Sequence, residues 1–492
     1  MGPRAREGDR AVDWFGAENS DAARFVLQRG VALVYVLAFV AALRQFRPLL
    51  GEHGLLPVPA FVARVPARLA PSMFHRHYSD VLLVALAWLG LTVAATLVVG
   101  LPQSGPPWLP LLAFAVAWAI YLSIVNVGQV FYGFGWESLL LEAGFLAAFL
   151  GSDDVAAPVT VIILFRWLVF RVEFGAGMIK MRGDPCWRDL TCLYYHHETQ
   201  PMPNQGSWFF HHLPRPLHKA EVAANHVTQL VVPFLLFVPQ PVATFAAAVI
   251  VITQAWLVLS GNFAWLNALT MLLAFSAVGD EQLDAVLPWS VGTPGHAPMP
   301  EWFAVVVLAM TALMVVLSWW PARNLLDHHQ KMNASFNRWH LAGAYGAFGS
   351  ITRRRNEVVV EGTEDEDPFT TDWHEYEFKG KPGPTGRMPR QWAPYHLRLD
   401  WGMWFLALGS PSQHRWFTVF LLRLLEADVP TLRLLRRDPF TGRQPRYVRA
   451  RVFRYRYSTW EELRRTRQWW VRRETGILVA PQSLETMRSL LR

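Results

Sequence analysis

The 492-residue chain is poor in cysteine, lysine and charged residues. It contains 2 cysteines, and 41 of its 46 basic residues are arginine, a bias typical of a GC-rich, bacterial coding sequence. Charged residues make up 17% of the chain, compared with about 25% in soluble domains. The scarcity of cysteine excludes a disulfide-rich secreted scaffold. The low charge, together with 52% hydrophobic residues, favours a membrane protein.

Motifs of several soluble protein classes are also missing. Neither a phosphate-binding P-loop nor a dinucleotide fingerprint occurs. The sequence Gly206-Ser207-Trp208 is not followed by the glycine that a serine nucleophile elbow requires. The net charge of +8 would suit nucleic-acid binding, but no recognition motif accompanies it. Much of the arginine follows the apolar segments, where anionic lipid attracts it, so we expect membrane lipid as a partner and no nucleic acid.

Long apolar runs are what the chain contains in abundance. A bilayer of about 30 Å is crossed by a helix of about 20 apolar residues. Runs 136–150, 225–239 and 263–278 are short enough to be re-entrant or merely buried. We predict an α-helical polytopic membrane protein with about 8–9 spans. The runs are 25–43, 81–100, 109–127, 136–150, 158–180, 225–239, 241–259, 263–278 and 302–320.

The other segments set the predicted domain boundaries. Residues 1–24 form a polar leader without a cleavable signal peptide, so the first span would serve as the targeting signal. A multi-span domain covers 25–320 and includes a loop rich in Cys and His at 180–224. A basic juncture at 321–344 leads to an extramembrane α+β domain at 345–465. A basic, amphipathic helix at 466–492 is expected to follow.

The α+β domain shows patterns of both strands and helices. Residues 357–361 and 373–379 are expected to form strands, and 399–408 and 417–425 to form helices. The stretch 447–457 alternates strictly between two faces. We therefore expect it to be a twisted strand with one buried side.

The apolar segment 159–181 carries ionisable residues. Such groups cost roughly 2.5–3.5 kcal/mol each in hydrocarbon, so they usually have a partner or a task. Arg166, Glu173 and Lys180 recur every seven residues and share nearly one helical face, which we expect to point into the bundle. Seven residues are too far apart for the usual i,i+4 ion pair, so the partners must come from elsewhere. The expected partners, on the preceding apolar segment, are Glu137 and Glu142.

The two cysteines, Cys186 and Cys192, lie six residues apart in a turn that follows this segment. A disulfide between them would contribute about 2–3 kcal/mol if the loop faces an oxidising compartment. Free thiols are the alternative. Redox or metal chemistry fits less well, because the spacing is neither the redox C-x-x-C nor the shorter spacing of zinc sites.

Histidines crowd the same loop. We expect their imidazoles to face water or lipid headgroups. Two of them could hold zinc or iron together with Glu198, but adjacent histidines seldom ligate one ion from a single backbone segment. We therefore predict no metal site and no cofactor. The histidines concerned are His196, His197, His211 and His212.

Four sequence blocks stand out, namely 47–57, 174–191 with Tyr194 and 197–204, 345–352, and 393–395 with 398–401. Together they resemble the lipase maturation factor family. They occur in the family's order, and the resemblance covers most of the chain. In animals, members of this family are multi-pass proteins of the endoplasmic reticulum membrane that secreted lipases need to become active.

The resemblance implies a non-enzymatic membrane protein that assists folding, assembly or maturation of secreted clients such as lipases. Its location would be the cytoplasmic membrane if the protein is bacterial and the endoplasmic reticulum membrane in eukaryotic relatives. The loop 180–224 and the α+β domain would hold the client. The residues of the loop that we expect to take part are Asp184, Trp187, Asp189, His197 and Glu198.

The segment 175–187 also looks, more distantly, like the membrane domain of vitamin K-dependent carboxylases. In that family a lysine of the corresponding block acts on the quinol cofactor. The likeness implies an alternative, a membrane-embedded enzyme acting on a lipid or quinone with Lys180 as base, tuned by Glu173 or Arg166. The chain departs from that pattern at position 181, a methionine where the relatives tend to have another lysine.

Charge and family resemblance disagree about orientation. The connections 44–80, 180–224 and 321–355 are basic, which places the Cys loop and the α+β domain in the cytoplasm under the positive-inside rule. A role with secreted lipases places them outside. We favour the outside, because long segments obey the charge rule poorly.

Overall fold

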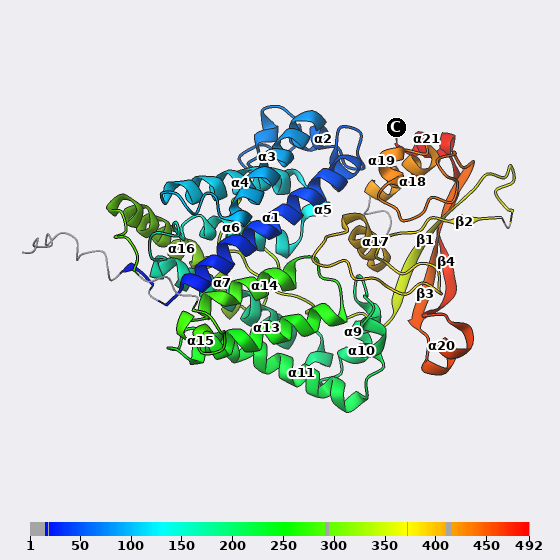
Figure 1. The fold of residues 1–492 in the computed structure, drawn as a ribbon. Helices are drawn as coiled ribbons and strands as arrows, with labels where there is room; N and C mark the ends of the chain where they lie inside the picture. Colours follow the sequence, from blue (N-terminus) through cyan, green and yellow to red (C-terminus); the bar gives the residue numbers. More distant parts are fainter. Residues whose placement is uncertain (1–14, 18, 291–294, 371, 410–414, 492) are drawn as a thin grey trace, which may run out of the picture.

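The computed structural model describes residues 15–491 except 18, 291–294, 371 and 410–414. Most of the leader predicted at 1–24 therefore lies outside the described residues. Helices make up the first two thirds of the chain, and a small sheet with covering helices lies at one end of the helical part (Figure 1). The protein is thus mostly helical with a C-terminal sheet region, as predicted.

The helical part combines long helices with short connecting ones. The helices of ten or more residues are α1 (Asp21–Leu50), α3 (Asp80–Val99), α4 (Trp108–Val127), α6 (Gly135–Ala147), α7 (Val159–Arg182), α11 (Arg215–Leu230), α13 (Val242–Ser260) and α16 (Glu301–Leu326). The shorter ones are α2 (Val58–Val62), η3 (Met73–His75), α5 (Gln129–Tyr132), α8 (Pro185–Arg188), α9 (Leu193–Thr199), α10 (Ser207–His211), α12 (Val232–Leu235), α14 (Leu266–Ala274), η4 (Phe275–Ala277) and α15 (Asp280–Asp284).

Five helices of the described chain are long and apolar enough to cross a membrane, namely α1, α3, α4, α13 and α16. The protein is therefore a multi-pass membrane protein. This count is lower than the predicted 8–9 spans. The remaining predicted runs form helices that are short, as α6 and α14 are, interrupted, as between α11 and α12, or charged, as α7 is.

Helix α1 passes through the middle of the bundle, in contact with α3, α6 and α14 (Figure 1). Its N-terminus is buried, where backbone N–H groups need acceptors. The carboxylate of Asp280 accepts from the backbone N of Asp21 at 2.8 Å and of Ala22 at 2.9 Å. One turn later the buried Arg24 donates to the carbonyl of Ser152 at 2.7 Å. Residues distant in sequence, from α15 and from the segment after α6, therefore supply hydrogen-bond acceptors at the start of this central helix.

The C-terminal part is built on an antiparallel sheet in the order β2-β1-β3-β4. The register of β1 and β3 places Glu361 opposite Arg449, and the Glu361 carboxylate accepts from Arg449 Nε at 2.6 Å and from Arg451 Nε at 2.9 Å. The elements are β1 (Arg355–Thr363), β2 (His374–Glu375), α17 (Arg398–Leu408), α18 (Arg415–Leu425), α19 (Val429–Leu432), β3 (Tyr447–Tyr457), α20 (Trp460–Thr466), β4 (Trp470–Ser483) and α21 (Leu484–Leu491).

The strands predicted at 357–361 and 447–457 are confirmed as β1 and β3, and the two predicted helices as α17 and α18. The strand predicted at 373–379 is wrong in length, because β2 has only two residues. The backbone N of Tyr376 still donates to the carbonyl of Val360 at 3.0 Å, but after this residue the chain leaves β1. The backbone N of Glu377 donates to the carbonyl of Arg437 instead.

The helix predicted at 466–492 is wrong for most of its length. Residues Trp470–Ser483 form strand β4, and only Leu484–Leu491 is helical. Arg467, with φ 55°, ends α20 in the left-handed conformation and lets the chain turn back along β3. Pairing with an open strand edge decides the conformation of such a segment more strongly than local propensity does.

Strand β3 also departs from the prediction of one buried side. Near its start, Val448 and Ala450 are buried on one face. Further along, Phe453, Tyr455 and Tyr457 are buried on the other face, where they pack with other aromatic residues. The strand changes its covered side because helices cover its first half and the loop containing α10 covers its second half.

A buried ion pair joins the C-terminal part to the helical part. Arg398 at the start of α17 donates to Glu137 Oε1 of α6 at 2.7 Å, and both side chains are 0% exposed. The same oxygen lies 3.4 Å from His396 Nδ1. Tyr121 donates to the other carboxylate oxygen. The guanidinium also lies over the ring of Tyr132, 3.4 Å from its centroid.

Replacing Arg398 by methionine should destabilise the protein strongly, because it leaves the Glu137 carboxylate buried without its cation. Loss of one partner of a buried pair typically costs about 3–5 kcal/mol. The measurement is the midpoint of thermal unfolding of the purified protein in detergent. Arg398→Met combined with Glu137→Gln should recover part of the loss, and Arg464→Met, at an exposed site, is the control. An unchanged midpoint in the single Arg398 variant would contradict a stabilising pair.

Candidate functional site

Helix α7 directs its ionisable side chains into the bundle, as predicted. Glu173 and Lys180 are 1% and 6% exposed, and Arg166 is half-buried. Lys180 Nζ donates to Asn225 Oδ1 at 2.9 Å and to Gln229 Oε1 at 2.8 Å. The ammonium group is thus held by neutral amides of α11.

Arg166 and Glu173 likewise form hydrogen bonds with uncharged groups. Arg166 donates to the carbonyls of Ser276 at 3.0 Å and Leu236 at 3.1 Å. Gln254 of α13 donates to Glu173 Oε1 at 2.6 Å. The second oxygen of Glu173 has no hydrogen-bond partner among the described residues. The arrangement therefore keeps a carboxylate, an ammonium group and several amides together inside the bundle.

The predicted pairing of this face with the preceding helix is wrong. Glu142 pairs with Arg171, which lies on another side of α7, and accepts from Tyr345 OH at 2.7 Å. Glu137 pairs with Arg398, more than two hundred residues later in the chain. Sequence reasoning expected both carboxylates to find partners, but spacing along a helix carried no information about a partner from the C-terminal part.

A cavity of about 1080 Å³ lies beside the charged face of α7. Glu173 and Lys180 belong to its wall, together with Asn225 and Gln229. Apolar clefts of this size with a few polar groups are typical of ligand sites. Elements from both parts of the chain enclose the cavity, and its aromatic lining includes Phe134, Trp136, Phe263, Phe348 and Trp401.

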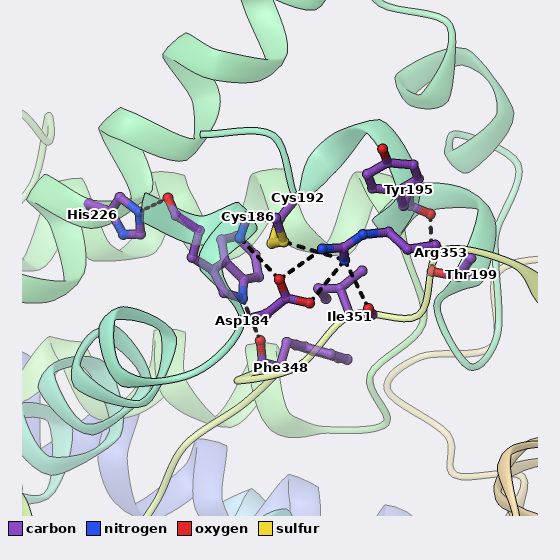
Figure 2. Close-up of a disulfide and its surroundings, with 10 residues drawn as sticks. Asp184, Cys186, Cys192, Tyr195, Thr199, His226, Phe348, Ile351 and Arg353 are labelled. Atoms are coloured by element: carbon purple, nitrogen blue, oxygen red, sulfur yellow. Dashed lines mark hydrogen bonds and ion pairs between the residues drawn. A yellow bond between two sulfur atoms is a disulfide. The ribbon is translucent and has the colours of Figure 1, made fainter. Parts of the chain in front are cut away.

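The loop that follows α7 is closed by a disulfide between Cys186 and Cys192. This confirms one of the alternatives left open by the sequence. Figure 2 shows Arg353 reaching toward Asp184 beside the disulfide. The two side chains form a bidentate ion pair of 2.8 and 2.9 Å. Hydrogen bonds from Arg353 hold the pKa of the Asp184 carboxyl below its ordinary value.

The segment that leads into β1 fastens the loop further. Asp184 N donates to the carbonyl of Gly349 at 2.8 Å, and Trp187 Nε1 to that of Phe348 at 2.8 Å. Gly183 must lack a side chain, because a Cβ there would collide with the same Gly349 carbonyl. On the other side, His226 of α11 lies 3.0 Å from the Trp187 carbonyl (Figure 2).

The five residues expected to meet a client occupy different environments. Asp184 and Trp187 are engaged within the fold, as described above, and Asp189 is exposed. Burial raises the pKa of Glu198, whose Oε2 accepts from the backbone N of Tyr457 at 2.9 Å. His197 is 1% exposed, and burial together with neighbouring histidines places its pKa well below the ordinary value.

The expectation that the loop histidines face water or headgroups is wrong for two of them. His196 is buried as well as His197, and burial lowers the pKa of His196 to about 3. His218 of α11, which the sequence interpretation did not single out, is also buried and lies against His197. The available signal was its i,i+3 spacing to Glu221, which places both on one helical face.

The chain is similar to known proteins over almost its whole length. A family model described as lipase maturation factor transmembrane domain matches residues 22–285, and one described as lipase maturation factor C-terminal domain matches 341–480. Lipase maturation factor 1 of Homo sapiens is 38% identical over 95% of this chain and 89% of its own length. The Bos taurus protein of the same name is 38% identical over 94% and 90%. Lipase maturation factor 2 of Gallus gallus is 29% identical over 90% and 79%. No solved structure matches the chain.

Reversing the charge of Glu173 with Glu173→Lys should reduce the yield of folded protein, because it removes a carboxylate and adds a cation to a cavity wall that already holds Lys180 and Arg182. The measurement is the amount of monodisperse protein recovered in detergent at equal expression. Glu173→Gln retains a partner for Gln254 and should behave nearly as the wild type. Adding Lys180→Glu should restore part of the yield, whereas adding Arg166→Glu should not, because Arg166 binds carbonyls. Wild-type yield for Glu173→Lys would show that this side chain is not enclosed.

Proposed function

The chain belongs to the lipase maturation factor family, and from this membership we propose that it assists the folding, assembly or maturation of secreted lipases. The observation that carries the proposal is the 38% identity to human lipase maturation factor 1 across 95% of the chain, which includes both family domains. The resemblance predicted from four sequence blocks is confirmed. The comparisons do not support the alternative of a membrane-embedded enzyme.

We propose that the client binds where the Cys loop and the C-terminal part form one continuous surface. Arg355 of β1 supports this, because it donates to the loop carbonyls of Glu198 at 2.9 Å and Pro201 at 3.1 Å. Trp208 Nε1 donates to the carbonyl of Ser458 at 3.0 Å. The loop therefore cannot move independently of the sheet without breaking buried hydrogen bonds.

An exposed pair of aromatic residues marks the candidate client surface. Phe209 from the loop is 45% exposed and Trp460 from α20 is 48% exposed, with ring centroids 6.0 Å apart. Exposed apolar groups that lie together are typical of interaction sites. A partly folded lipase exposes apolar segments, so its chemistry suits such a pair.

We propose the predicted domain division with one change. The multi-span domain of 25–320, with its loop at 180–224, and the juncture at 321–344 are retained. The extramembrane domain of 345–465 extends to 491, because β4 pairs with β3. We also retain 8–9 spans as a proposal, in which α7 crosses while packed against α11 and α14, with Gln254 of α13 bound to Glu173.

We propose that the Cys loop and the C-terminal domain face the oxidising side of the membrane. The disulfide supports this orientation, because cytoplasmic thiols stay reduced. That side would be the outside of the cytoplasmic membrane in a bacterium, or the lumen of the endoplasmic reticulum. Exposed apolar side chains on α3 and α13, such as Val81 and Ile252, would meet membrane lipid.

Deleting the gene should lower the specific activity of secreted lipase, measured as lipase activity divided by immunodetected lipase protein. Complementation with the wild-type gene should restore it. The double variant Phe209→Ser with Trp460→Ser should restore it only in part, while Phe369→Ser, at an aromatic residue 87% exposed elsewhere, should restore it fully. Equal amounts of membrane-embedded factor must be present in each case. Unchanged specific activity across all secreted lipases of the deletion strain would refute the function.

Labelling of the two cysteines should report the orientation directly. With the loop outside, a membrane-impermeant maleimide should not react with intact cells until a mild reductant opens the disulfide, after which both cysteines react. Cys186→Ser with Cys192→Ser is the background control. Labelling that occurs only in broken cells, without reductant, would place the loop in the cytoplasm and contradict the proposed orientation.

A further inference from the structure

We propose that His197, His218 and Glu221 bind a divalent transition metal ion, with zinc as the best match to their chemistry. Each residue offers one ligand atom, and these atoms all lie within 4.8 Å of one another. The proposal is independent of lipase maturation, because it rests only on the geometry of these three side chains.

The three ligands come from two helices that face each other. His218 and Glu221 lie three residues apart on α11 and therefore occupy one face, one turn apart. His197 of α9 approaches that face, with its ring centroid 5.7 Å from that of His218. Ligand atoms at bonds of about 2.0–2.1 Å in a filled tetrahedral zinc site stand about 3.4 Å apart. Changes in side-chain rotamer that move each ligand atom by about 1 Å would bring the three atoms to the separation of a filled site.

Unsatisfied polar atoms provide a second, independent indication of a ligand. His197 is 1% exposed, yet neither of its ring nitrogens has a hydrogen-bond partner among the described residues. His218 Nδ1 and Glu221 Oε2 are likewise buried and unpartnered there. Leaving such groups unpaired is unfavourable, and a bound ion would give each of the three residues a partner for one of these atoms.

A neighbouring side chain holds the carboxylate in place. Trp256 Nε1 donates to Glu221 Oε1 at 2.8 Å, and the other oxygen, Oε2, has no hydrogen-bond partner among the described residues and is available to an ion. Hydrogen bonds from neighbouring residues to a ligating carboxylate orient it, and they are common in protein metal sites. Glu221 also lies on the wall of the large cavity, so the ion would sit at the boundary between cavity and loop.

Two imidazoles and one carboxylate match zinc with its fourth coordination position open, and a similar set binds ferrous iron. The second group of ligand-type residues, Asp184 with Cys186 and Cys192, does not compete, because its sulfurs form a disulfide. An ion at the proposed site would tie α9 to α11 and so brace the loop that carries the disulfide.

The test uses the full-length protein purified in detergent, stripped with a chelator, reloaded with zinc and separated from free metal by gel filtration. Elemental analysis should then find about one zinc per chain. Zinc should also raise the midpoint of thermal unfolding. His197→Gln, His218→Gln and Glu221→Gln should each weaken zinc binding by at least about tenfold. Cobalt provides a second probe, since its visible absorption reports a site with nitrogen and oxygen ligands.

Matched controls separate this site from other histidines and from the cysteines. His212→Gln should keep the zinc, because His212 Nδ1 already lies 2.7 Å from the Trp208 carbonyl. Cys186→Ser with Cys192→Ser should keep it as well. Folded wild-type protein that retains no zinc after reloading would overturn the proposal, as would equal zinc binding in the wild type and the Glu221→Gln variant, whose side chain keeps its size.

Discussion

The buried pair of Arg398 and Glu137 is the interaction on which the arrangement of the two parts depends. Desolvating two charges is costly, so the groups around a buried pair decide how well it is tolerated. Tyr121 and His396 contact the Glu137 carboxylate. The Arg398 guanidinium donates to the Phe131 carbonyl at 2.8 Å and lies over the Tyr132 ring, although its Nε and Nη2 have no hydrogen-bond partner among the described residues. The pair therefore specifies one docking geometry of α17 against α6.

That fixed geometry explains why the Cys loop has a defined position. The chain between α16 and β1 passes along α7, where the carbonyls of Phe348 and Gly349 receive hydrogen bonds from the loop. Arg355 then binds loop carbonyls from the other side. Because α17 packs against β1, which begins at Arg355, displacement of α17 would be transmitted through β1 to the loop. The disulfide alone closes only a few residues and could not orient the loop relative to the sheet.

Local patterns predicted much of the fold, whereas partners distant in sequence were not predictable. Alternation identified β3, and apolar runs located the long helices, because both signals reside in neighbouring residues. The conversion of 470–483 into β4 depended on a free edge of β3, which no local pattern reveals. The same reason applies to the site. Inward placement of Glu173 and Lys180 followed from helical spacing, but their amide partners lie on α13 and α11.

The charged residues of α7 differ in whether an opposite charge or neutral amides stabilise them, and this difference is informative about the role of the cavity. Arg171 and Glu142 neutralise each other, and Glu142 also accepts from Tyr345 OH and from the backbone N of Gly343, as the carboxylate of a structural pair does. Lys180 and Glu173 instead use neutral amides, and one oxygen of Glu173, a residue of the cavity wall, has no hydrogen-bond partner among the described residues. Holding two charges in this way costs more than pairing them closely. A protein that needed only stability would gain by replacing both with apolar residues of similar volume. The arrangement is therefore better explained by the cavity than by the stability of the bundle.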